Sequence, residues 1–470
     1  MDFSKVKRGY FVGIGGVGVN ALARFATDFG IEVSGSDAKV NGLCAKLVER
    51  GAIIGDKPNF DAIDKADFLV FSSAIPSDNP EIARAKERGI PVFERHEFLG
   101  EVASLFGKVV GIAGTHGKTT TSAMLTQILF ENGVKFASMI GGESIDFSNY
   151  VNNTGAKSFA DLKDCTFACE ACEYKRNLLA LPADVAVVLN AECDHPDCYE
   201  NLESVKSTFA EFLQKAKVKI VCDEYADLVD GDCRQKETSG FCVRLSGEEK
   251  EKVRCFYNGK NAIYSDGKFM ASAKLQDDGE YNYKNAAFAL AAAKAIGQDF
   301  KKSVRALTEY RGVKRRFERA QDIAGAKVYF DFAHHPSEIA SLINRAKPMG
   351  KILVVFQPHT YSRTKAYLND FAKVLGVKNN GVKTLAIMPT YAAREIPRDG
   401  VESDELVKAI FDKFRKRNVY LVKDKQSTVD FVKSQAKNHD VILMIGAGDI
   451  YDLKELLSYA YMHIGTYVSK

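Results

Sequence analysis

Short apolar runs recur along the chain, and each is followed by a glycine-rich or polar loop and then by a stretch with helical periodicity. The first run, Tyr10–Ile14, enters a glycine loop and then the stretch "NALARFATDF". Runs of the same kind occur in "KVVGIA", "KILVVF" and "DVILMI". Strands that alternate in this way with helices build parallel α/β sheets. The pattern therefore predicts an α/β protein with mainly parallel sheets.

Three such series of strands and helices divide the 470 residues into three predicted domains. The boundaries fall at 1–107, 108–320 and 321–470, which agrees with the ~150 residues of a typical domain. A strand over "IPVFERHEFL" is predicted to close the first domain near residue 106. In the second domain, the polar and strand-rich stretch 216–278 is predicted to be a β-insertion, with a helix following over 281–297.

The composition excludes several classes of protein. A formal net charge of +4 is too small for a dedicated nucleic-acid binder, so nucleic acid is not expected as a partner. No apolar run approaches the ~18 residues of a membrane helix, so membrane insertion is not expected either. Glycines interrupt the apolar stretch near the N-terminus and Arg24 ends it, which argues against a signal peptide. We therefore expect a cytoplasmic enzyme.

Ten cysteines in a chain without a secretory signal are expected to be thiols rather than disulfides. Cys169 and Cys172 have the spacing of half a zinc site, and Cys193 and Cys198 would supply the other half. The wider spacing of the second pair and the acids around both pairs favour ordinary buried or loop cysteines.

The loop after the first predicted strand has the glycine spacing of a diphosphate site. Four glycines lie in it: Gly13, Gly15, Gly16 and Gly18. Glycines let the backbone approach a diphosphate at a helix N-terminus, and Asp37, at the end of the next strand, would lie near a ribose. Ser72 follows a further strand in a polar loop. The pattern favours a diphosphate ligand over a bare turn, and leaves open whether that ligand is NAD or a sugar nucleotide.

A second glycine loop, "GTHGKTT", ends like a triphosphate site but has an unusual spacing. The usual loop has a glycine five residues before Gly117, where this chain has Ile112. A triphosphate site needs inward backbone N–H groups, a lysine and a hydroxyl that holds Mg²⁺. The residues that could supply these lie in one run: Gly114, Thr115, His116, Gly117, Lys118, Thr119 and Thr120. A glycine-rich helix entry would need neither Lys118 nor Thr119, so we predict an ATP site.

Ligands for Mg²⁺ must also come from elsewhere in the sequence. Glu170 ends one predicted strand, and His195 follows another, beside Asp194. The carboxyl ends of parallel strands meet at one edge of a sheet, so both residues are predicted to lie beside the phosphate loop. We therefore predict Thr119, Glu170 and His195 as metal ligands, and an ordinary hydrogen-bonded loop histidine is an equal alternative for His195.

In this order along nearly the whole chain, these motifs resemble the Mur ligase family. The phosphate loop is similar to that of all Mur ligases and of folylpolyglutamate synthases, whereas "GIGGVG", "AHHP" and "FQPHTYSRT" resemble the alanine-adding branch. The resemblance implies a Rossmann-like first domain, a central P-loop ATPase domain and a Rossmann-like third domain. It also implies a reaction: ATP phosphorylates the lactyl carboxylate of UDP-N-acetylmuramate, and the amine of L-alanine displaces phosphate to form an amide.

The resemblance further implies roles for individual residues. The first glycine loop, with Asp37 and Ser72, would bind the sugar nucleotide. Four residues would meet ATP on its adenine, phosphate and ribose sides: Asn282, Asn285, Arg316 and Asp331. Five would line the amino-acid side: His334, His335, His359, Tyr361 and Arg363. The residues implied in catalysis are Lys118, Glu170, His195, His335 and Arg363.

Each of these residues also has a local alternative. Asn282 could cap the following helix, Arg315 and Arg316 could form a solvated basic patch, and His334 and His335 could bond within their loop. The chain also departs from the family pattern at several positions: Cys172, Tyr281, Phe330, Phe332 and Thr360.

Other functions remain open at this stage. An NAD-dependent oxidoreductase would rest on the first glycine loop alone, and a non-catalytic nucleotide-binding regulator would have no need of the phosphate-site residues. A ligase that attaches a recycled murein peptide to UDP-N-acetylmuramate is a nearer alternative. The sequence does not separate L-alanine from glycine or serine, since one methyl group is worth only ~1–3 kcal/mol in a pocket. It also leaves the oligomeric state open.

Overall fold

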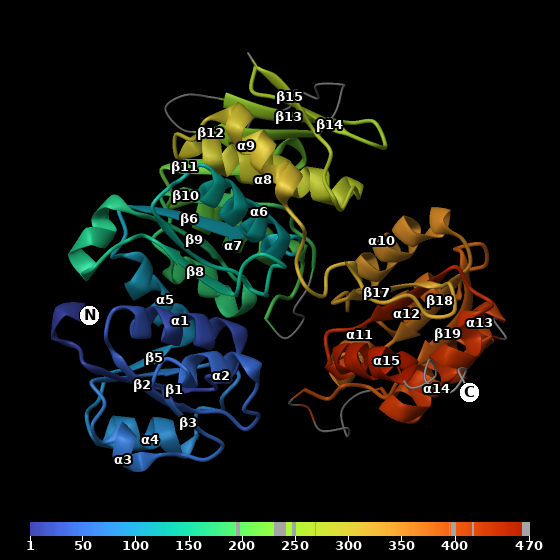
Figure 1. The fold of residues 1–470 in the computed structure, drawn as a ribbon, viewed down its shortest axis with the longest axis horizontal. Coiled ribbons are helices and arrows are strands. Elements are labelled where there is room, and N and C mark those ends of the chain that lie inside the picture. Colours follow the sequence, from blue (N-terminus) through green and yellow to red (C-terminus); the bar gives the residue numbers. More distant parts are fainter. Residues whose placement is uncertain are drawn as a thin grey trace. The chain divides into compact units, whose positions relative to one another are not determined.

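In the computed structural model, the described residues are 1–193, 198–229, 241–246, 251–267, 269–393, 395, 401–415 and 418–462. The chain forms two compact units, Met1–Val313 and Lys314–Lys470, each treated by itself below. Three sheets with helices against them confirm the predicted α/β class (Figure 1). Among the helices that the structure describes, none is long and apolar enough to cross a membrane.

The first sheet is parallel and has the order β3-β2-β1-β4-β5. Its strands are β1 (Arg8–Val12), β2 (Glu32–Ser36), β3 (Ile53–Gly55), β4 (Phe68–Phe71) and β5 (Val92–Glu94). Its helices are α1 (Val17–Asp28), α2 (Gly42–Val48), α3 (Phe60–Ile63), α4 (Pro80–Glu87) and α5 (Arg95–Ala103). The chain runs outward from β1 in one direction and then returns to β4 on its other side. Such a reversal opens a crevice at the carboxyl end of the central strand, where the first glycine loop lies.

The predicted strand over "IPVFERHEFL" is wrong beyond its first residues. Only Val92–Glu94 is a strand, and the helix α5 begins at Arg95. Glu94 and Glu97 form a reciprocal capping box there: the side chain of Glu97 accepts the Glu94 backbone N–H at 2.7 Å, and that of Glu94 accepts the Glu97 backbone N–H. This cap satisfies backbone donors that would otherwise be orphaned and so starts the helix inside an apolar run.

The second sheet has the order β15-β14-β13-β12-β11-β10-β6-β9-β7-β8. Its parallel centre consists of β6 (Lys108–Ala113), β7 (Phe136–Met139), β9 (Thr166–Glu170), β10 (Val185–Val188) and β11 (Val218–Cys222). Antiparallel strands extend it on both sides: β8 (Tyr150–Asn153), β12 (Phe241–Ser246), β13 (Glu251–Tyr257), β14 (Ala262–Ser265) and β15 (Met270–Ala273). The predicted β-insertion is thus confirmed as a continuation of the central sheet.

Helices pack on this second sheet: α6 (Lys118–Glu131), α7 (Leu202–Gln214), α8 (Glu280–Ala295) and α9 (Phe300–Ala306). The helices α6 and α8 share one hydrophobic core with the inner strands, and both are buried on most of their surface. Helices that are buried on most of their surface need cover on most sides. The pair therefore fixes the N-terminus of α6, where the phosphate loop ends.

The second unit contains a six-stranded sheet in the order β16-β17-β21-β18-β19-β20. Its strands are β16 (Glu318–Arg319), β17 (Lys327–Asp331), β18 (Ile352–Phe356), β19 (Val382–Ile387), β20 (Val419–Leu421) and β21 (Val441–Ile445). Its helices are α10 (Pro336–Ala346), α11 (Tyr361–Ala366), α12 (Leu368–Gly376), α13 (Ser403–Phe414), α14 (Lys425–Ala436) and α15 (Leu453–Met462). Only β16 runs antiparallel, and hydrophobic clusters cover both faces of the sheet.

Candidate active site

The phosphate loop connects β6 to α6, and its unusual glycine spacing has a cause in the fold. Gly114 and Gly117 have φ angles of +135° and +88°, a region that side chains disfavour. A Cβ on Gly117 would lie 2.6 Å from Oδ1 of Asn285 on α8, and one on Gly114 would lie 3.0 Å from Cβ of Leu189. Neighbouring segments therefore approach the loop backbone too closely for any larger residue.

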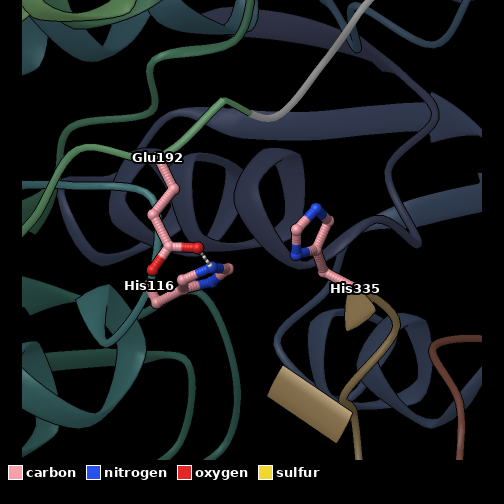
Figure 2. A group of neighbouring side chains, drawn as sticks. All are labelled: His116, Glu192 and His335. Atoms are coloured by element: carbon pink, nitrogen blue, oxygen red, sulfur yellow. Dashed lines mark hydrogen bonds and ion pairs between the residues drawn. The ribbon is translucent and has the colours of Figure 1, made fainter. Parts of the chain in front are cut away.

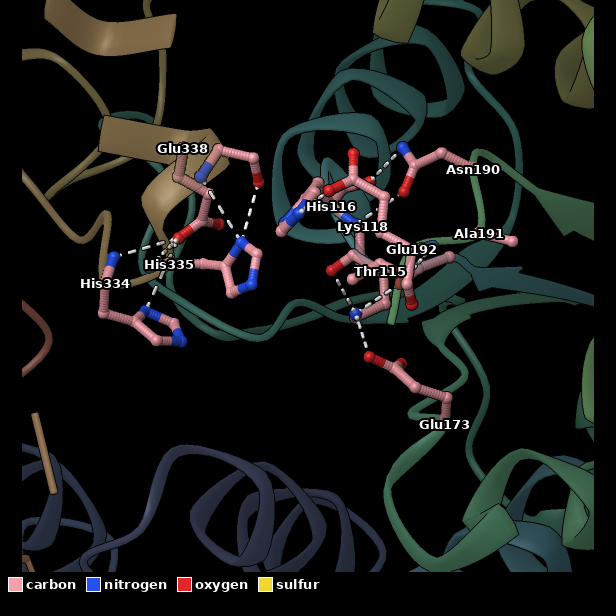
Figure 3. Close-up of polar contacts among 12 residues, drawn as sticks. Thr115, His116, Lys118, Glu173, Asn190, Ala191, Glu192, His334, His335 and Glu338 are labelled. Atoms are coloured by element: carbon pink, nitrogen blue, oxygen red, sulfur yellow. Dashed lines mark hydrogen bonds and ion pairs between the residues drawn. The ribbon is translucent and has the colours of Figure 1, made fainter. Parts of the chain in front are cut away.

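Lys118, the first residue of α6, turns back over the loop (Figure 3). Its Nζ donates hydrogen bonds to the carbonyl oxygens of Gly114 at 2.5 Å and Thr115 at 3.0 Å. It also lies 3.0 Å from Oε1 of Glu173, which is 3% exposed. Burial works to lower the pKa of Lys118, but the charge and hydrogen bond of Glu173, together with the nearby Cys172 and Glu170, outweigh it and the pKa is raised. The ammonium is therefore held charged over a loop of inward-facing backbone.

The segment after β10 fixes the loop from the opposite side. Asn190 accepts the backbone N–H of His116 at 2.8 Å and donates to its carbonyl at 3.0 Å. The hydroxyl of Thr115 accepts the backbone N–H of Glu192 at 2.9 Å. Oε2 of Glu192 lies 3.3 Å from Nε2 of His116 (Figure 2). These contacts hold the loop in one shape before any ligand is present, as an electrostatic binding site requires.

Of the two acids in "EACE", Glu173 is the one in contact with Lys118. The predicted ligand Glu170 ends β9, and its carboxylate accepts the backbone N–H of Gly141 at 2.5 Å. It still acts on Lys118 through space, since its charge helps to raise the lysine pKa. A backbone turn follows in which Lys175 and Arg176 have positive φ angles of 51° and 60°. Both carboxylates thus lie near the phosphate loop.

The remaining predicted metal ligands have different outcomes. Thr119 is buried in the first turn of α6, beside the partly buried Thr120. His195 lies outside the described residues, so its role stays a prediction. Among the residues that the structure does describe, no group of metal-ligating side chains includes the cysteines proposed for zinc. Burial raises the pKa of the thiols of Cys169 and Cys172, which opposes the thiolate form that zinc needs.

The two predicted adenine-side asparagines lie on the first turns of α8. Asn285 reaches Gly117, as described above, and so contacts the phosphate loop itself. Asn282 donates from Nδ2 to the carbonyl of Asp277 at 3.3 Å. It does not cap the helix, because the N-cap is Gly279. Tyr281, one of the departures from the family pattern, is 64% exposed.

The first glycine loop binds its own acid. The backbone N–H of Gly15 donates to Oδ2 of Asp37 at 2.8 Å, and Asn41 donates to the Gly15 carbonyl at 2.9 Å. The sequence predicts Asp37 near a ribose, and in the fold it holds the loop to the end of β2.

The other glycines of this loop are also closely packed: a Cβ on Gly13 would lie 3.2 Å from Ser72, and one on Gly18 would lie 2.8 Å from Arg95. On Gly16, which caps α1, a Cβ would lie 3.3 Å from the carbonyl oxygen of Gly13. Close packing within the protein thus favours small residues in this loop.

In the second unit, Asp331 ends β17 and organises two loops. Its carboxylate accepts the backbone N–H of Phe317 at 2.7 Å and that of Ala333 at 2.8 Å. Burial raises its pKa to about 6, against the lowering effect of the Arg316 charge. The predicted contact of Asp331 with ribose must therefore share an acceptor that already holds these loops.

The histidines after β17 form a helix cap. The backbone N–H groups of His334 and His335 both donate to Oε2 of Glu338, at 2.9 Å and 3.2 Å (Figure 3). Nδ1 of His335 lies 2.8 Å from the hydroxyl of Ser337, which completes the start of α10. The local alternative for these histidines is therefore confirmed for their backbone and for this ring nitrogen. The cap also fixes where the rings point.

The predicted residues after β18 gather around a short helix. Thr360, where the family often has arginine, caps α11 at a positive φ of 67°, and its backbone N–H donates to the carbonyl of Tyr391 at 2.9 Å. The ring of His359 stacks on Tyr391 at 5.6 Å and lies 5.9 Å from the ring of His334. Tyr361 is buried in the first turn of α11, and Arg363 follows it. Residues from two separate strand ends thus share one edge of this sheet.

Two residues of the site were missed by the sequence analysis: Glu173 and Asn190. Each follows a strand whose carboxyl end meets the edge of β6, which is the signal that could have found them. What the pattern lacked was the direction of each side chain.

Comparison with known families accounts for most of the chain. Residues 9–107 match "Mur ligase family, catalytic domain", residues 112–293 match "Mur ligase middle domain", and residues 315–448 match "Mur ligase, glutamate ligase domain". These three matches cover both glycine loops and the predicted residues of the second unit.

Curated relatives and solved structures extend this likeness. The chain is 34% identical over 467 residues to the UDP-N-acetylmuramate–L-alanine ligase of Caldanaerobacter subterraneus subsp. tengcongensis, covering 97% of this chain and 98% of that protein. It is 33% identical to the enzyme of the same name from Clostridium acetobutylicum, covering 96% and 97%. The fold matches that of the UDP-N-acetylmuramate–alanine ligase of Thermotoga maritima, with a TM-score of 0.76, 24% identity and coverage of 97% and 99%. A murein peptide ligase from Psychrobacter arcticus has a TM-score of 0.64, 20% identity and coverage of 97% and 98%.

Proposed function

The chain belongs to the Mur ligase family, and from this membership we propose that it is the ATP-dependent ligase that joins L-alanine to the lactyl carboxylate of UDP-N-acetylmuramate. The observation that carries the proposal is the charged Lys118 over a preformed phosphate loop, with two carboxylates beside it. Relatives named for this reaction match the chain from end to end. We further propose a cytoplasmic location, since the reaction consumes ATP.

The chemistry requires an activated carboxylate, because a free carboxylate is a poor electrophile. Transfer of the γ-phosphoryl group of ATP to the lactyl carboxylate would give an acyl phosphate, which the amine of L-alanine attacks with loss of phosphate. The first step brings anions together, and Lys118 would offset this repulsion. The loop N–H groups would bind the phosphates at the N-terminus of α6, where the helix dipole favours negative charge.

We propose Mg²⁺ as the metal of this reaction, and the residues present fit it. Hard cations take oxygen ligands, and the hydroxyl of Thr119 and the carboxylates of Glu170 and Glu173 all lie around the phosphate loop. His195 stays a predicted further ligand. The ion would neutralise phosphate charge when bound. The first glycine loop, with Asp37 and Ser72, is proposed for the sugar nucleotide.

In the second unit, we propose Arg316 and Asp331 for ATP, and His334, His335, His359, Tyr361 and Arg363 for the acceptor amino acid. An arginine presents a planar fork that matches a carboxylate through two hydrogen bonds, so Arg363 is the residue proposed to hold the carboxylate of L-alanine. Arg363→Lys keeps the charge but loses the fork. It should raise the KM for L-alanine and leave the KM for both nucleotides unchanged.

The test is phosphate release with purified protein, ATP, UDP-N-acetylmuramate and separate acceptors. We expect release that depends on the sugar nucleotide and on L-alanine, with glycine and L-serine slower, and no release by Lys118→Ala. Release with the tripeptide L-alanyl-γ-D-glutamyl-meso-diaminopimelate but not with L-alanine would replace the proposal with the recycling ligase. A change in NADH fluorescence on binding, without phosphate release, would favour an oxidoreductase instead.

A further inference from the structure

The segment before β16 forms a strained turn that contains the arginine proposed for ATP. Arg315 and Phe317 have positive φ angles of 63° and 47°, and neither is a glycine. Such conformations persist only where neighbouring groups hold them. Here the backbone N–H of Arg315 donates to Glu318 at 2.7 Å, and its carbonyl accepts the N–H of Phe332 at 2.7 Å. Between the two strained residues lies Arg316.

The guanidinium of Arg315 binds groups of the protein itself. Its Nη2 donates to the carbonyl of Gly448 at 2.9 Å and lies 3.4 Å from that of Gly446. The same group lies 4.6 Å from the ring centroid of Phe332 and 5.1 Å from that of Tyr451. Burial lowers its pKa, in keeping with a group drawn out of water. Arg315 is therefore no part of a solvated basic patch, the alternative considered from the sequence.

The neighbouring guanidinium of Arg316 meets the same aromatic ring. It lies 5.3 Å from the centroid of Phe332, and its charge acts on Asp331. Phe332 departs from the polar residues common at this position in the family, so in this chain one ring contacts both arginines. The direction of Arg316 is thus set on a surface that Arg315 and Phe332 build together.

The carbonyl groups that bind Arg315 belong to a fixed loop. Gln357 accepts the backbone N–H of Ile450 at 3.0 Å and donates to Asp449 at 2.7 Å. A Cβ on Gly448 would lie 2.6 Å from the ring of Tyr391, so this loop is packed on its far side. Arg315 consequently connects the strained turn to a loop whose conformation is fixed by hydrogen bonds and packing.

We propose that Arg315 is a positioning residue, which binds the loop 446–448 and thereby holds the turn 315–317 so that Arg316 points to its substrate. This inference rests on the proposed function, in which Arg316 binds the phosphates of ATP. Lysine is a poor replacement for Arg315, because an ammonium lacks the guanidinium plane that lies over the rings of Phe332 and Tyr451.

The experiment is a double-mutant cycle with Arg315→Lys and Arg316→Lys in the full chain. Loss of a hydrogen bond to a charged group predicts about a tenfold rise in the KM for ATP in Arg315→Lys, with the KM for UDP-N-acetylmuramate unchanged. If Arg315 acts by orienting the guanidinium of Arg316, the double variant should equal Arg316→Lys alone, because the guanidinium being positioned is already absent. Effects that multiply in the double variant, or an unchanged KM in Arg315→Lys, would overturn the proposal.

Arg319→Lys is the matched control. Arg319 also pairs with an acid, Asp322, and lies 5.6 Å from the ring of Tyr329, but it is exposed on the same segment. Its substitution should leave every KM unchanged. If Arg315→Lys does not fold, Tyr451→Leu removes one stacking partner and should raise the same KM to a smaller extent, and an unchanged KM would count against the proposal. A wild-type protein without phosphate release would refute the proposed function instead, which separates the two failures.

Discussion

The sharpest prediction concerns the buried ion pair between Lys118 and Glu173. In Glu173→Gln the side chain keeps its size and still offers an oxygen to Nζ, so only the charge is lost. The two exposed fractions are 16% for the lysine side chain and 4% for that of the glutamate, with a separation of 3.0 Å. Salt should therefore screen the pair weakly.

Coulomb's law gives the scale of the effect. Two unit charges at this separation attract by about 5 kcal/mol at an effective dielectric constant of ~20, which is a ceiling because desolvation opposes it. Two loop carbonyls still accept from Nζ in the variant, so we expect a net loss of about 1–2 kcal/mol in folding free energy. The sign follows from the raised pKa of Lys118: its contribution to stability is fully present at neutral pH, below the ordinary lysine pKa of 10.5.

In Glu173→Gln, the affinity for metal-free ATP should rise, whereas the rate of phosphate release should fall. In this variant, metal-free ATP meets one carboxylate fewer and a lysine whose charge is no longer neutralised by Glu173, so its affinity should rise by about three- to tenfold, or roughly 1 kcal/mol. If Glu173 also supports Mg²⁺, phosphate release at saturating Mg²⁺ and substrates should fall by about a hundredfold. The assays are calorimetry of ATP binding in excess chelator and steady-state phosphate release.

Asp266→Asn is the control for buried charge in general. Asp266 pairs with Lys294 at the far end of α8, with exposed fractions of 8% and 18% and a separation of 3.3 Å. The variant should lower the melting temperature in the same way and leave ATP affinity and turnover unchanged. Wild-type turnover together with wild-type ATP affinity in Glu173→Gln would refute the reasoning.

Three further predictions test other parts of the two units. Gly117→Ala should abolish ATP binding, because its new Cβ would lie 2.6 Å from Asn285. Its control is Gly133→Ala, also at positive φ but with nothing within 4 Å of the new Cβ, which should cost only backbone strain; similar ATP affinity in the two variants would contradict the prediction. Gly15→Ala would place a Cβ 2.9 Å from Asp37 and should raise the KM for UDP-N-acetylmuramate but not the KM for ATP. The control is Gly42→Ala, where a Cβ meets nothing within 4 Å, and equal shifts in both KM values of Gly15→Ala would rule out the assignment of the first glycine loop to the sugar nucleotide. Because the pKa of Asp331 is raised to about 6, its contribution to stability is greatest below pH 3.8, the ordinary pKa, and is lost as the pH rises to about 6. The free energy of unfolding of wild type relative to Asp331→Asn should therefore fall between these pH values, and a difference that does not change with pH would show that the pKa of Asp331 is not raised.

Periodicity and glycine placement by themselves determine much of the architecture of this protein. The parallel centre of each sheet follows from apolar runs separated by helical stretches. The edge on which chemistry gathers is also predictable, because the carboxyl ends of parallel strands lie together. Lys118 and Thr119 can be assigned on that basis, since their place at a helix N-terminus is a local property.

The tertiary structure decided which side chain faces which partner. Glu170 and Glu173 are the same residue type and close in sequence, yet Glu170 at the end of β9 binds the backbone of Gly141, whereas Glu173 binds Lys118. Asp37 is used by its own glycine loop, and Asn285 reaches a loop formed far earlier in the chain. Local pattern fixes the period of a strand or helix, but a side chain beyond the last periodic residue takes its direction from long-range contacts. Those contacts exist only once the sheets and helices have packed.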